Sequence, residues 1–345
     1  DVGYWGSILT SEAISGPIYS QMYYTLNSAL QVDSMYAGGV SINFGYDGDE
    51  LVTSAGNENL SYDSNSLVSQ ISLGNVVQSN SYNSYGELSN TTGYYSSAPI
   101  FSQNITRDDN GRIISLAEGA DTINYSYDNL GRLTDVNKNG AAVGHYEYDD
   151  NGNRTSASIR GQIFSGVYDD QDRLTSYGTK TYSYNNNGDL VSVANSADST
   201  TKSFVYDVFG NLKQANVAGK TMTYLVDAKN RRVGKKVNGL LSQAFVYQNQ
   251  TNIAAELDGN SNLVSRFIYA SKSNVPDYMI KNGSVYRIIS DSIGSVRVVV
   301  DVNTGAYAQL IKYDEFGQVL SDSNPGFQPF GFAGGIYDRD TGLVR

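Results

Sequence analysis

The sequence predicts an all-β protein built as an array of antiparallel β-hairpins. A short phrase recurs along its 345 residues: Tyr-Asp, two variable residues, Gly, a polar residue and an aliphatic residue. Aromatic and aliphatic residues alternate with polar ones around each copy, which is the period of two of a β-strand. Neighbouring copies are separated by about 16 to 22 residues, a fixed spacing that is typical of repeat proteins. We therefore expect one hairpin per repeat and a curled or spiral sheet along most of the chain.

The cleanest copy of the phrase runs from Tyr125 to Thr134. Looser copies begin at Tyr46, Tyr62, Tyr168 and Tyr184. The residues that we assign to the repeat signature are Tyr127, Asp128, Gly131, Arg132, Tyr148, Asp149, Gly152, Tyr206, Asp207, Gly210, Tyr313, Asp314 and Gly317.

The phrase has the chemistry of a tight turn. The Asp128 side chain can accept hydrogen bonds from nearby backbone N–H groups, and Gly131 tolerates the positive φ that follows a type I turn. Such a Gly forms the bulge of the common three-residue hairpin loop. Tyr127 should then face Leu133, and Asp128 should face Arg132. Each cross-strand pair contributes roughly 0.2–1 kcal/mol, so the hairpins must gain their stability by stacking.

The phrase resembles the tyrosine-aspartate (YD) repeats of the Rhs family, which are shared with the C component of bacterial Tc toxins and with teneurins. A second resemblance is more specific, because the last residues are similar to the opening of the Rhs repeat-associated core motif. The residues that carry it are Pro329, Phe330, Gly331, Gly334, Tyr337, Asp338, Thr341, Gly342 and Leu343.

Three segments follow from these patterns. Residues 1–43 carry apolar residues without the Tyr-Asp phrase, and we expect degenerate strands that continue the array. Residues 44–328 form the YD-repeat hairpin array, and residues 329–345 begin the core motif. The chain has no signal peptide at Asp1, which fits a fragment or a processed product.

Composition narrows the class of protein. The chain has 28 Tyr and 35 Gly but only 5 Pro and no Cys, so disulfides play no part. It lacks the long apolar run that a membrane helix needs. A net charge of −11 argues against binding to a nucleic-acid backbone. We interpret the basic cluster from Lys229 to Lys236 as a solvated turn and strand face, with a partner or cargo contact as the alternative.

The sequence predicts no catalytic residue, no metal site and no cofactor. His145 is the only histidine, which excludes a two-histidine metal site, and no Gly-x-Ser-x-Gly nucleophile elbow is present. Aspartic proteases use an Asp-Thr-Gly tripeptide, but they need two carboxylates that share a proton. The single tripeptide that starts at Asp340 is therefore expected to be a turn. The acidic hairpin turns lack the ligand spacing of a calcium loop.

The resemblance implies a structural role: part of a β-strand shell that encloses a C-terminal toxin domain of a secreted, polymorphic bacterial toxin. The implied partners are that toxin domain and further repeats of the same shell. The alternative is a cell-surface adhesion or glycan-binding module, in which tyrosines stack on carbohydrate. Because the tyrosines recur at repeat positions, cross-strand packing is the favoured interpretation. Either role places the protein outside the cell or at its surface.

Overall fold

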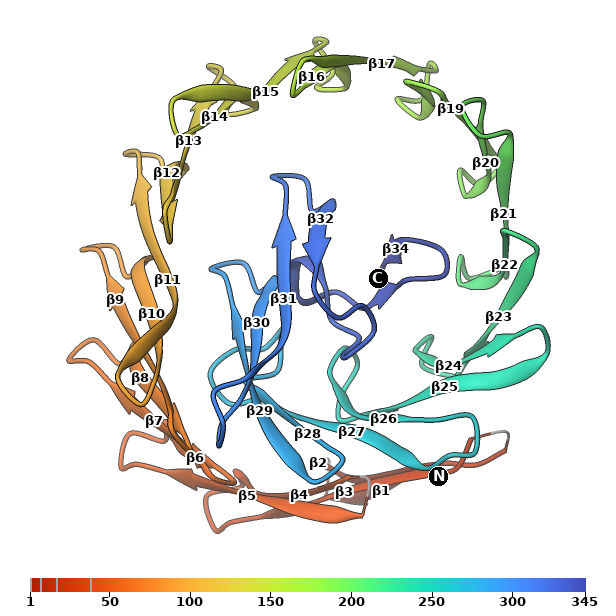
Figure 1. Ribbon diagram of the computed structural model, residues 1–345. Helices are drawn as coiled ribbons and strands as arrows, with labels where there is room; N and C mark the ends of the chain where they lie inside the picture. Colours follow the sequence, from red (N-terminus) through yellow and green to blue (C-terminus); the bar gives the residue numbers. More distant parts are fainter. Residues whose placement is uncertain (1, 7, 17, 38) are drawn as a thin grey trace. The chain divides into compact units, whose positions relative to one another are not determined.

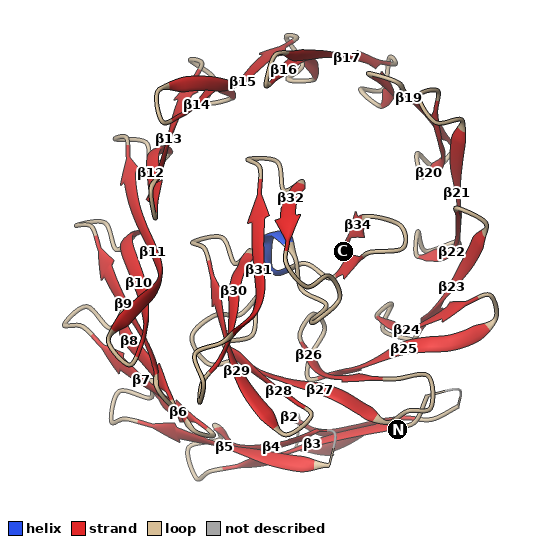
Figure 2. Cartoon of the chain, in the orientation of Figure 1, coloured by secondary structure: helices blue, strands red, loops and turns tan. Residues whose placement is uncertain are grey.

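A computed structural model describes residues 2–6, 8–16, 18–37 and 39–345. Nearly all regular structure in these residues is β-strand, as Figure 2 shows, and the single exception is the short 3₁₀ turn η1 (Phe332–Gly334). Strands β1 to β32 are joined into one sheet of 32 strands, and the strand pairs with a described register are antiparallel neighbours in the chain. The predicted all-β array of antiparallel hairpins is confirmed. Within the described residues, no helix is long and apolar enough to cross a membrane.

The chain divides into two compact units. Unit 1 comprises residues 1–101 and 224–345, and unit 2 comprises residues 102–223. Figure 1 colours the chain from red to blue along this sequence. The division follows packing, whereas the three segments proposed from the sequence follow the repeat phrase, and those segments remain a proposal.

The first part of unit 1 is a run of short hairpins. Its strands are β1 (Val2–Trp5), β2 (Ile8–Ile14), β3 (Ser20–Leu26), β4 (Val32–Ala37), β5 (Val40–Tyr46), β6 (Val52–Ala55), β7 (Glu58–Tyr62), β8 (Val68–Leu73), β9 (Val76–Tyr82) and β10 (Leu88–Tyr95). The described residues before the first Tyr-Asp phrase also form strands. The turn that follows β3 even has the repeat chemistry, because Asn27 Oδ1 accepts hydrogen bonds from the N–H groups of Ala29 and Gln31.

Strand β11 (Ala98–Arg107) leads into unit 2, which continues the same hairpins. Its further strands are β12 (Ile113–Glu118), β13 (Asp121–Tyr127), β14 (Leu133–Lys138), β15 (Ala141–Tyr148), β16 (Arg154–Ile159), β17 (Gln162–Tyr168), β18 (Leu174–Tyr177), β19 (Lys180–Tyr184), β20 (Leu190–Asn195), β21 (Thr200–Tyr206) and β22 (Leu212–Val217), with β23 (Lys220–Val226) leading back into unit 1.

The second part of unit 1 contains the remaining strands. They are β24 (Arg232–Val237), β25 (Leu240–Tyr247), β26 (Ile253–Leu257), β27 (Leu263–Ile268), β28 (Tyr278–Lys281), β29 (Ser284–Ser290), β30 (Val296–Asp301), β31 (Tyr307–Tyr313) and β32 (Val319–Asp322), followed by the separate hairpin of β33 (Tyr337–Asp338) and β34 (Leu343–Val344).

Unit 1 has two sheet layers with a core between them. One apolar cluster joins Met22 and Met35 of the first strands to Phe267, Met279 and Ile288 of the later ones, and all five side chains are buried. A second cluster joins the β5–β9 region to β29 and β30 in the same way. The strands of β25 to β30 are therefore rich in consecutive apolar residues, because both of their faces are covered.

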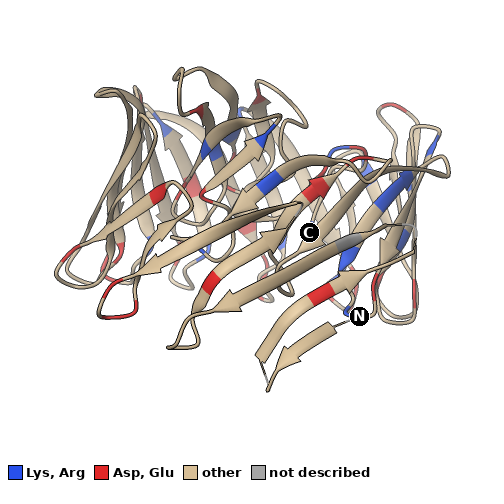
Figure 3. Cartoon of the chain, turned by 90° about the horizontal axis from the view of Figure 1, so that it is seen from below, with Lys and Arg blue, Asp and Glu red and all other residues tan. Residues whose placement is uncertain are grey.

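Unit 2 is a single succession of hairpins, and residues 102–223 provide no second layer. One apolar cluster of buried residues consists of Val136, Tyr146 and Ala157, with partly buried neighbours around them, and Phe204, Ala215 and Met222 are buried in later strands. Strand β13 shows strict alternation of exposed and half-buried residues, and β17 does so after its first residue, which is the pattern of a sheet with one apolar face. Several acidic residues lie in the hairpin turns, as Figure 3 shows for the whole chain.

Candidate functional site

The Tyr-Asp turn is held by the aspartate. Asp128 Oδ1 accepts hydrogen bonds from the N–H groups of Leu130 and Arg132, both at 2.9 Å. The Asp128 N–H donates to the Arg132 carbonyl and the Gly131 N–H donates to the Asp128 carbonyl, each at 3.0 Å. Gly131 has φ of +80°. This is the predicted three-residue loop with a Gly bulge. The backbone hydrogen bond from Arg132 and the other bonds lower the pKa of Asp128.

The predicted cross-strand pairs are present beside this turn. Tyr127 is paired with Leu133, with a bulge between Ser126 and Tyr127. On the Asp128 side, Arg132 Nε donates to Asp128 Oδ2 at 2.6 Å. The other signature turns have the same form. Positive φ is found at Gly152, Gly210 and Gly317, and the carboxylates of Asp149, Asp207 and Asp314 accept backbone N–H groups.

The tyrosine does more than pack, because its hydroxyl joins neighbouring repeats. Tyr148 OH donates to the carbonyl of Leu133 in the preceding hairpin at 2.8 Å. Tyr127 OH donates in the same way to the carbonyl of Ile113 at 2.7 Å. Burial raises the pKa of both phenols. We call this series of bonds the tyrosine ladder; its other members are Tyr46, Tyr62, Tyr82, Tyr168, Tyr184 and Tyr247.

The turn arginine supports the same contact. The Arg132 guanidinium lies over the Tyr148 ring, 5.0 Å from its centroid, while its Nε bonds to Asp128. Arg112 lies over Tyr127 at 4.9 Å in the preceding repeat. One arginine therefore holds its own turn and covers the tyrosine of the next hairpin. A cation–π contact of this kind contributes about 0.5–1 kcal/mol at an exposed site.

The last repeat packs on the C-terminal motif. Tyr313 is paired with Val319, and its ring meets Phe332 edge-on with centroids 5.8 Å apart. Inside the motif, Phe330 packs edge-on against Phe267 of β27, with centroids 4.9 Å apart. The motif is thus attached to the other strands of unit 1 by aromatic contacts with Tyr313 and Phe267.

Steric constraints explain why glycine is needed in the motif. Gly334 has φ of +77°, and a Cβ there would lie 2.3 Å from the Asn274 carbonyl oxygen, so only glycine fits. The Gly331 N–H donates to the Gly335 carbonyl at 2.7 Å, and the Tyr337 N–H donates to the Pro329 carbonyl at 2.9 Å.

The Asp-Thr-Gly tripeptide is the turn of the terminal hairpin. Asp338 is paired with Leu343, and the N–H groups of Thr341 and Gly342 donate to the Asp338 carbonyl at 3.2 and 2.7 Å. The predicted turn at Asp340 is therefore present. Gly342 has φ of +76°, and Thr341 is buried.

A buried charge cluster fixes this hairpin to unit 1. Tyr224 OH of β23 donates to Asp338 Oδ2 at 2.6 Å. Lys235 Nζ of β24 donates to Asp338 Oδ1 at 3.0 Å and to Asp340 Oδ2 at 2.7 Å. Burial and the bond to Asp338 raise the pKa of Tyr224. We name Tyr224, Lys235, Asp338 and Asp340 the Asp338 clasp.

The clasp brings together two carboxylates that the sequence did not pair. Each carboxylate contacts the ammonium of Lys235, whose positive charge offsets their negative charges. An aspartic protease instead requires two carboxylates that share one proton. The arrangement is suited to holding the hairpin. A tripeptide motif could not indicate it, because Lys235 lies more than a hundred residues earlier in the sequence.

The interpretation of the basic cluster at 229–236 as solvated holds for Lys229, which is exposed in the turn, and is wrong for Arg231 and Lys235. Arg231 is 2% exposed and bonds to Glu12 and Asp227, and Lys235 is buried in the Asp338 clasp. Arg231 occupies the same turn position as Arg132, and its guanidinium lies 5.1 Å from the Tyr247 ring centroid. The repeat phrase around Asp227 was hidden because Val226 replaces the tyrosine and Asn230, with φ of +61°, replaces the glycine.

The remaining candidates show no catalytic arrangement among the described residues. His145 is exposed on the polar face of β15, and its Nδ1 lies 2.7 Å from Asp135 Oδ1 on β14. No group of three or more His, Cys, Asp or Glu in the described part of the chain is placed to hold a metal ion.

Comparison with known proteins identifies the repeat. A family model described as the Teneurin YD-shell matches residues 2–345. The chain belongs to the Teneurin YD-shell family. The resemblance of the Tyr-Asp phrase to YD repeats is thus confirmed. This YD-shell chain is 29% identical to Teneurin-1 of Gallus gallus over 64% of its length, and 26% identical to Teneurin-4 of Mus musculus over 82%.

Bacterial relatives and solved structures extend the likeness. The YD-shell chain is 24% identical to the tRNA nuclease WapA of Bacillus subtilis over 63% of its length. It spans only 8–10% of the length of these curated relatives. The crystal structure of TcdB2-TccC3 has the same fold over 94% of the chain, with a TM-score of 0.64 at 14% identity, and the match covers 20% of that protein. The family and fold together define a structural, shell-type module.

Proposed function

We propose that this YD-shell chain is a non-catalytic wall segment that encloses a cargo domain located C-terminal to it in a longer natural protein, the cargo being a toxin. The proposal extends to further repeats of the same shell as partners and to action outside the producing bacterial cell. One relative, WapA, is named as a tRNA nuclease. On our proposal, any such activity would belong to the cargo and not to the YD-shell.

One observation carries the proposal: unit 2 has an apolar face that its own residues leave without a second layer. Ile123, Tyr125, Leu133 and Tyr148 are partly buried against their neighbours on this face. The opposite face carries Ser, Thr and Asn side chains, such as Ser126 and Asn124. Extended apolar surface on a protein marks a site that another polypeptide covers. A cargo chain is the partner that matches the family's shell architecture.

The Asp338 clasp supports the same proposal. It holds the terminal hairpin on β23 and β24 through Tyr224 and Lys235, both buried. A chain that continues beyond this hairpin would leave from a fixed point of the wall. No observation on the described residues favours the adhesion or glycan-binding alternative, and binding of carbohydrate is not proposed.

Photocrosslinking in the natural full-length precursor tests the proposal. A photoreactive residue at position 125 projects from the apolar face, and one at the adjacent position 126 projects from the polar face of the same strand. We expect crosslinks to the cargo from position 125 and none from position 126. Ser126 is a suitable control position because it adjoins position 125 and lies on the other face of the same strand. Equal capture from both positions, or capture from neither, would contradict the cargo-lining role.

A further inference from the structure

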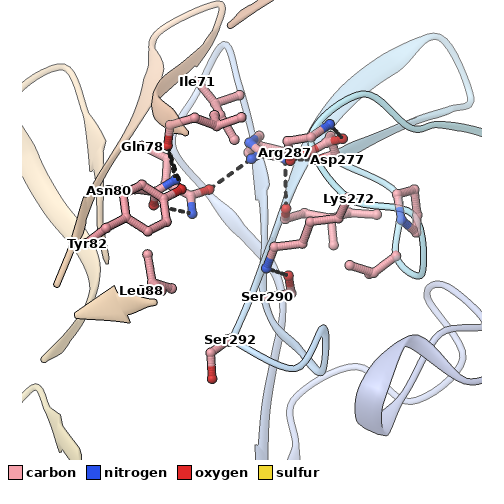
Figure 4. Close-up of a pocket in the computed structure, with 15 residues that line it drawn as sticks. Ile71, Gln78, Asn80, Tyr82, Leu88, Lys272, Asp277, Arg287, Ser290 and Ser292 are labelled. Carbon is pink, nitrogen blue, oxygen red and sulfur yellow. Dashed lines mark hydrogen bonds and ion pairs between the residues drawn. The ribbon is translucent and has the colours of Figure 1, made fainter. Parts of the chain in front are cut away.

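A cavity of about 200 Å³ with both polar and apolar lining residues lies inside unit 1. Strands β8 to β10 supply one wall, and the segment after β27 together with β29 supplies the other. Figure 4 shows Asn80, Tyr82 and Leu88 on one side and Lys272 and Ser290 on the other. The lining residues are Val68, Ile71, Gln78, Asn80, Tyr82, Leu88, Ser271, Lys272, Val275, Pro276, Asp277, Arg287, Ile288, Ser290 and Ser292.

The one acidic side chain of the lining is already engaged by the protein. Asp277 is 3% exposed, and its carboxylate accepts the N–H groups of Ala270 and Ser271 at 2.7 and 2.8 Å. The Ser271 hydroxyl donates to it as well. These bonds bind the carboxylate to its own loop, so Asp277 is a structural acceptor.

The two cationic side chains have donors to spare. Lys272 Nζ donates to Ser290 Oγ and to the Asp291 carbonyl, each at 2.8 Å, and an ammonium has a third N–H. Arg287 is 2% exposed, and its Nη atoms donate to the Gln78 side chain and to the Ile288 and Asp277 carbonyls. Its Nη1 also lies 3.6 Å from Glu58 Oε1 and 3.5 Å from Asp277 Oδ1. Its buried Nε has no hydrogen-bond partner among the described residues. A buried donor without a partner costs about 1–3 kcal/mol, which a ligand acceptor would recover.

We propose that this cavity binds a small oxyanion, a carboxylate or phosphate group, through the ammonium of Lys272 and the guanidinium of Arg287. The site is separate from the wall role of the module and adds a ligand to it. Pockets for drug-sized ligands measure about 300–1,000 Å³, so a volume of about 200 Å³ selects an ion or metabolite of few heavy atoms. Burial lowers the pKa of Lys272, and an anion bound beside it would raise that pKa again.

Calorimetric titration tests the proposal with sodium phosphate, sodium acetate and methylammonium chloride at constant ionic strength. We expect the anions to bind and methylammonium not to bind; the tighter of phosphate and acetate identifies the ligand group. Lys272→Met should weaken anion binding at least tenfold, or about 1.4 kcal/mol. Lys312→Met, at an exposed lysine of β31, is the matched control and should leave the affinity unchanged.

A second readout needs no variant and therefore does not depend on whether Lys272→Met folds. Acetic anhydride labelling followed by mass spectrometry should show that phosphate or acetate slows acetylation of Lys272 at least threefold and leaves Lys312 unaffected. Binding that survives Lys272→Met, absence of any anion binding, or equal protection of both lysines would overturn the proposal.

Discussion

The two units use the same repeat phrase in different surroundings, and the difference separates what the phrase supplies from what packing supplies. In unit 2 the hairpins are joined by the tyrosine ladder and by half-exposed turn arginines, within one layer. In unit 1 the same elements lie against a second layer, so that Arg231 becomes a buried member of an ion-pair network. The phrase therefore specifies the hairpin and its link to the next one, while the layer contacts decide how strongly each residue is held.

The largest expected effect comes from equivalent arginines in the two units. Arg231→Met leaves the Glu12 carboxylate, whose pKa is lowered in the folded chain, without its main partner, and removing one member of a buried pair costs about 3–5 kcal/mol. Arg132→Met, at a side chain that is 26% exposed, should cost under about 1 kcal/mol. Denaturant unfolding of both variants measures the difference. Equal losses would show that the second layer adds nothing to the turn.

A turn glycine separates backbone strain from packing. Gly131 has φ of +80°, and an added Cβ would make only an ordinary contact, 3.6 Å from Arg112, so the cost of Gly131→Val is strain of about 1–3 kcal/mol. Gly131→Asn should lose less, because Asn230 adopts φ of +61° at the equivalent position in unit 1. Unchanged denaturation midpoints for both variants would mean that the turn is assigned wrongly.

The tyrosine ladder should show a smaller effect. Tyr148→Phe removes the hydroxyl that bonds to the Leu133 carbonyl, and one such bond contributes about 0.5–1.5 kcal/mol. Tyr85→Phe is the control, since Tyr85 is 85% exposed at a turn tip and should show no change. Thermal denaturation of the two variants distinguishes them. If Tyr148→Phe lowers the melting temperature no more than Tyr85→Phe does, the tyrosine ladder does not contribute to the stability of unit 2.

Titration gives the subtlest contrast, because the shifts have opposite signs. The folded-state pKa values of Asp108, Asp128 and Asp169 are lowered, first by bonds from the turn arginines, so their stabilisation is present above about pH 4 and is lost as the pH falls through the folded values. Burial raises the pKa of Glu58 in unit 1, so its contribution is present below about pH 4 and is lost as the pH rises.

Unfolding midpoints across the pH range test this contrast. The stability gap between the unmodified chain and Asp128→Asn should shrink below about pH 4, whereas the penalty removed by Glu58→Gln should appear as the pH rises above that value. Parallel pH profiles for the two variants would contradict the assignment of opposite shifts.

Much of the hairpin could be predicted from sequence, because its causes are local. The Asp128 bonds, the Gly131 conformation and the pairing of Tyr127 with Leu133 depend on residues within seven positions of one another. The tyrosine ladder was not predicted. The sequence does contain an indication of it, because the repeat position is Tyr in copy after copy although Phe would pack equally well there. The ladder needs the hydroxyl to reach the preceding repeat, and the spacing of 15 residues between Tyr148 and Leu133 does not show that.

The long-range contacts could not be predicted from one sequence. Arg231 and Glu12 are 219 residues apart, and Lys235 and Asp338 are 103 residues apart, so only the packing of layers brings them together. A basic cluster in a polar sequence is normally solvated. Here it is partly buried, because Arg231 pairs with Glu12 from the first strands and Lys235 pairs with Asp338 from the last hairpin. The assignment of residues 329–345 to the start of the core motif stays a prediction.

Hydrogen exchange followed by mass spectrometry, on the isolated chain and on a longer protein in which the proposed cargo domain follows it, tests the central claim most directly. Exchange protection follows local stability. We expect β25, β26, β29 and β30 of unit 1 to be protected equally in both samples, because their own second layer covers them. Strands β13 to β16 of unit 2 should gain protection only in the longer protein, where cargo covers their apolar face. Identical exchange of these strands with and without cargo would contradict the proposal that this wall segment encloses it.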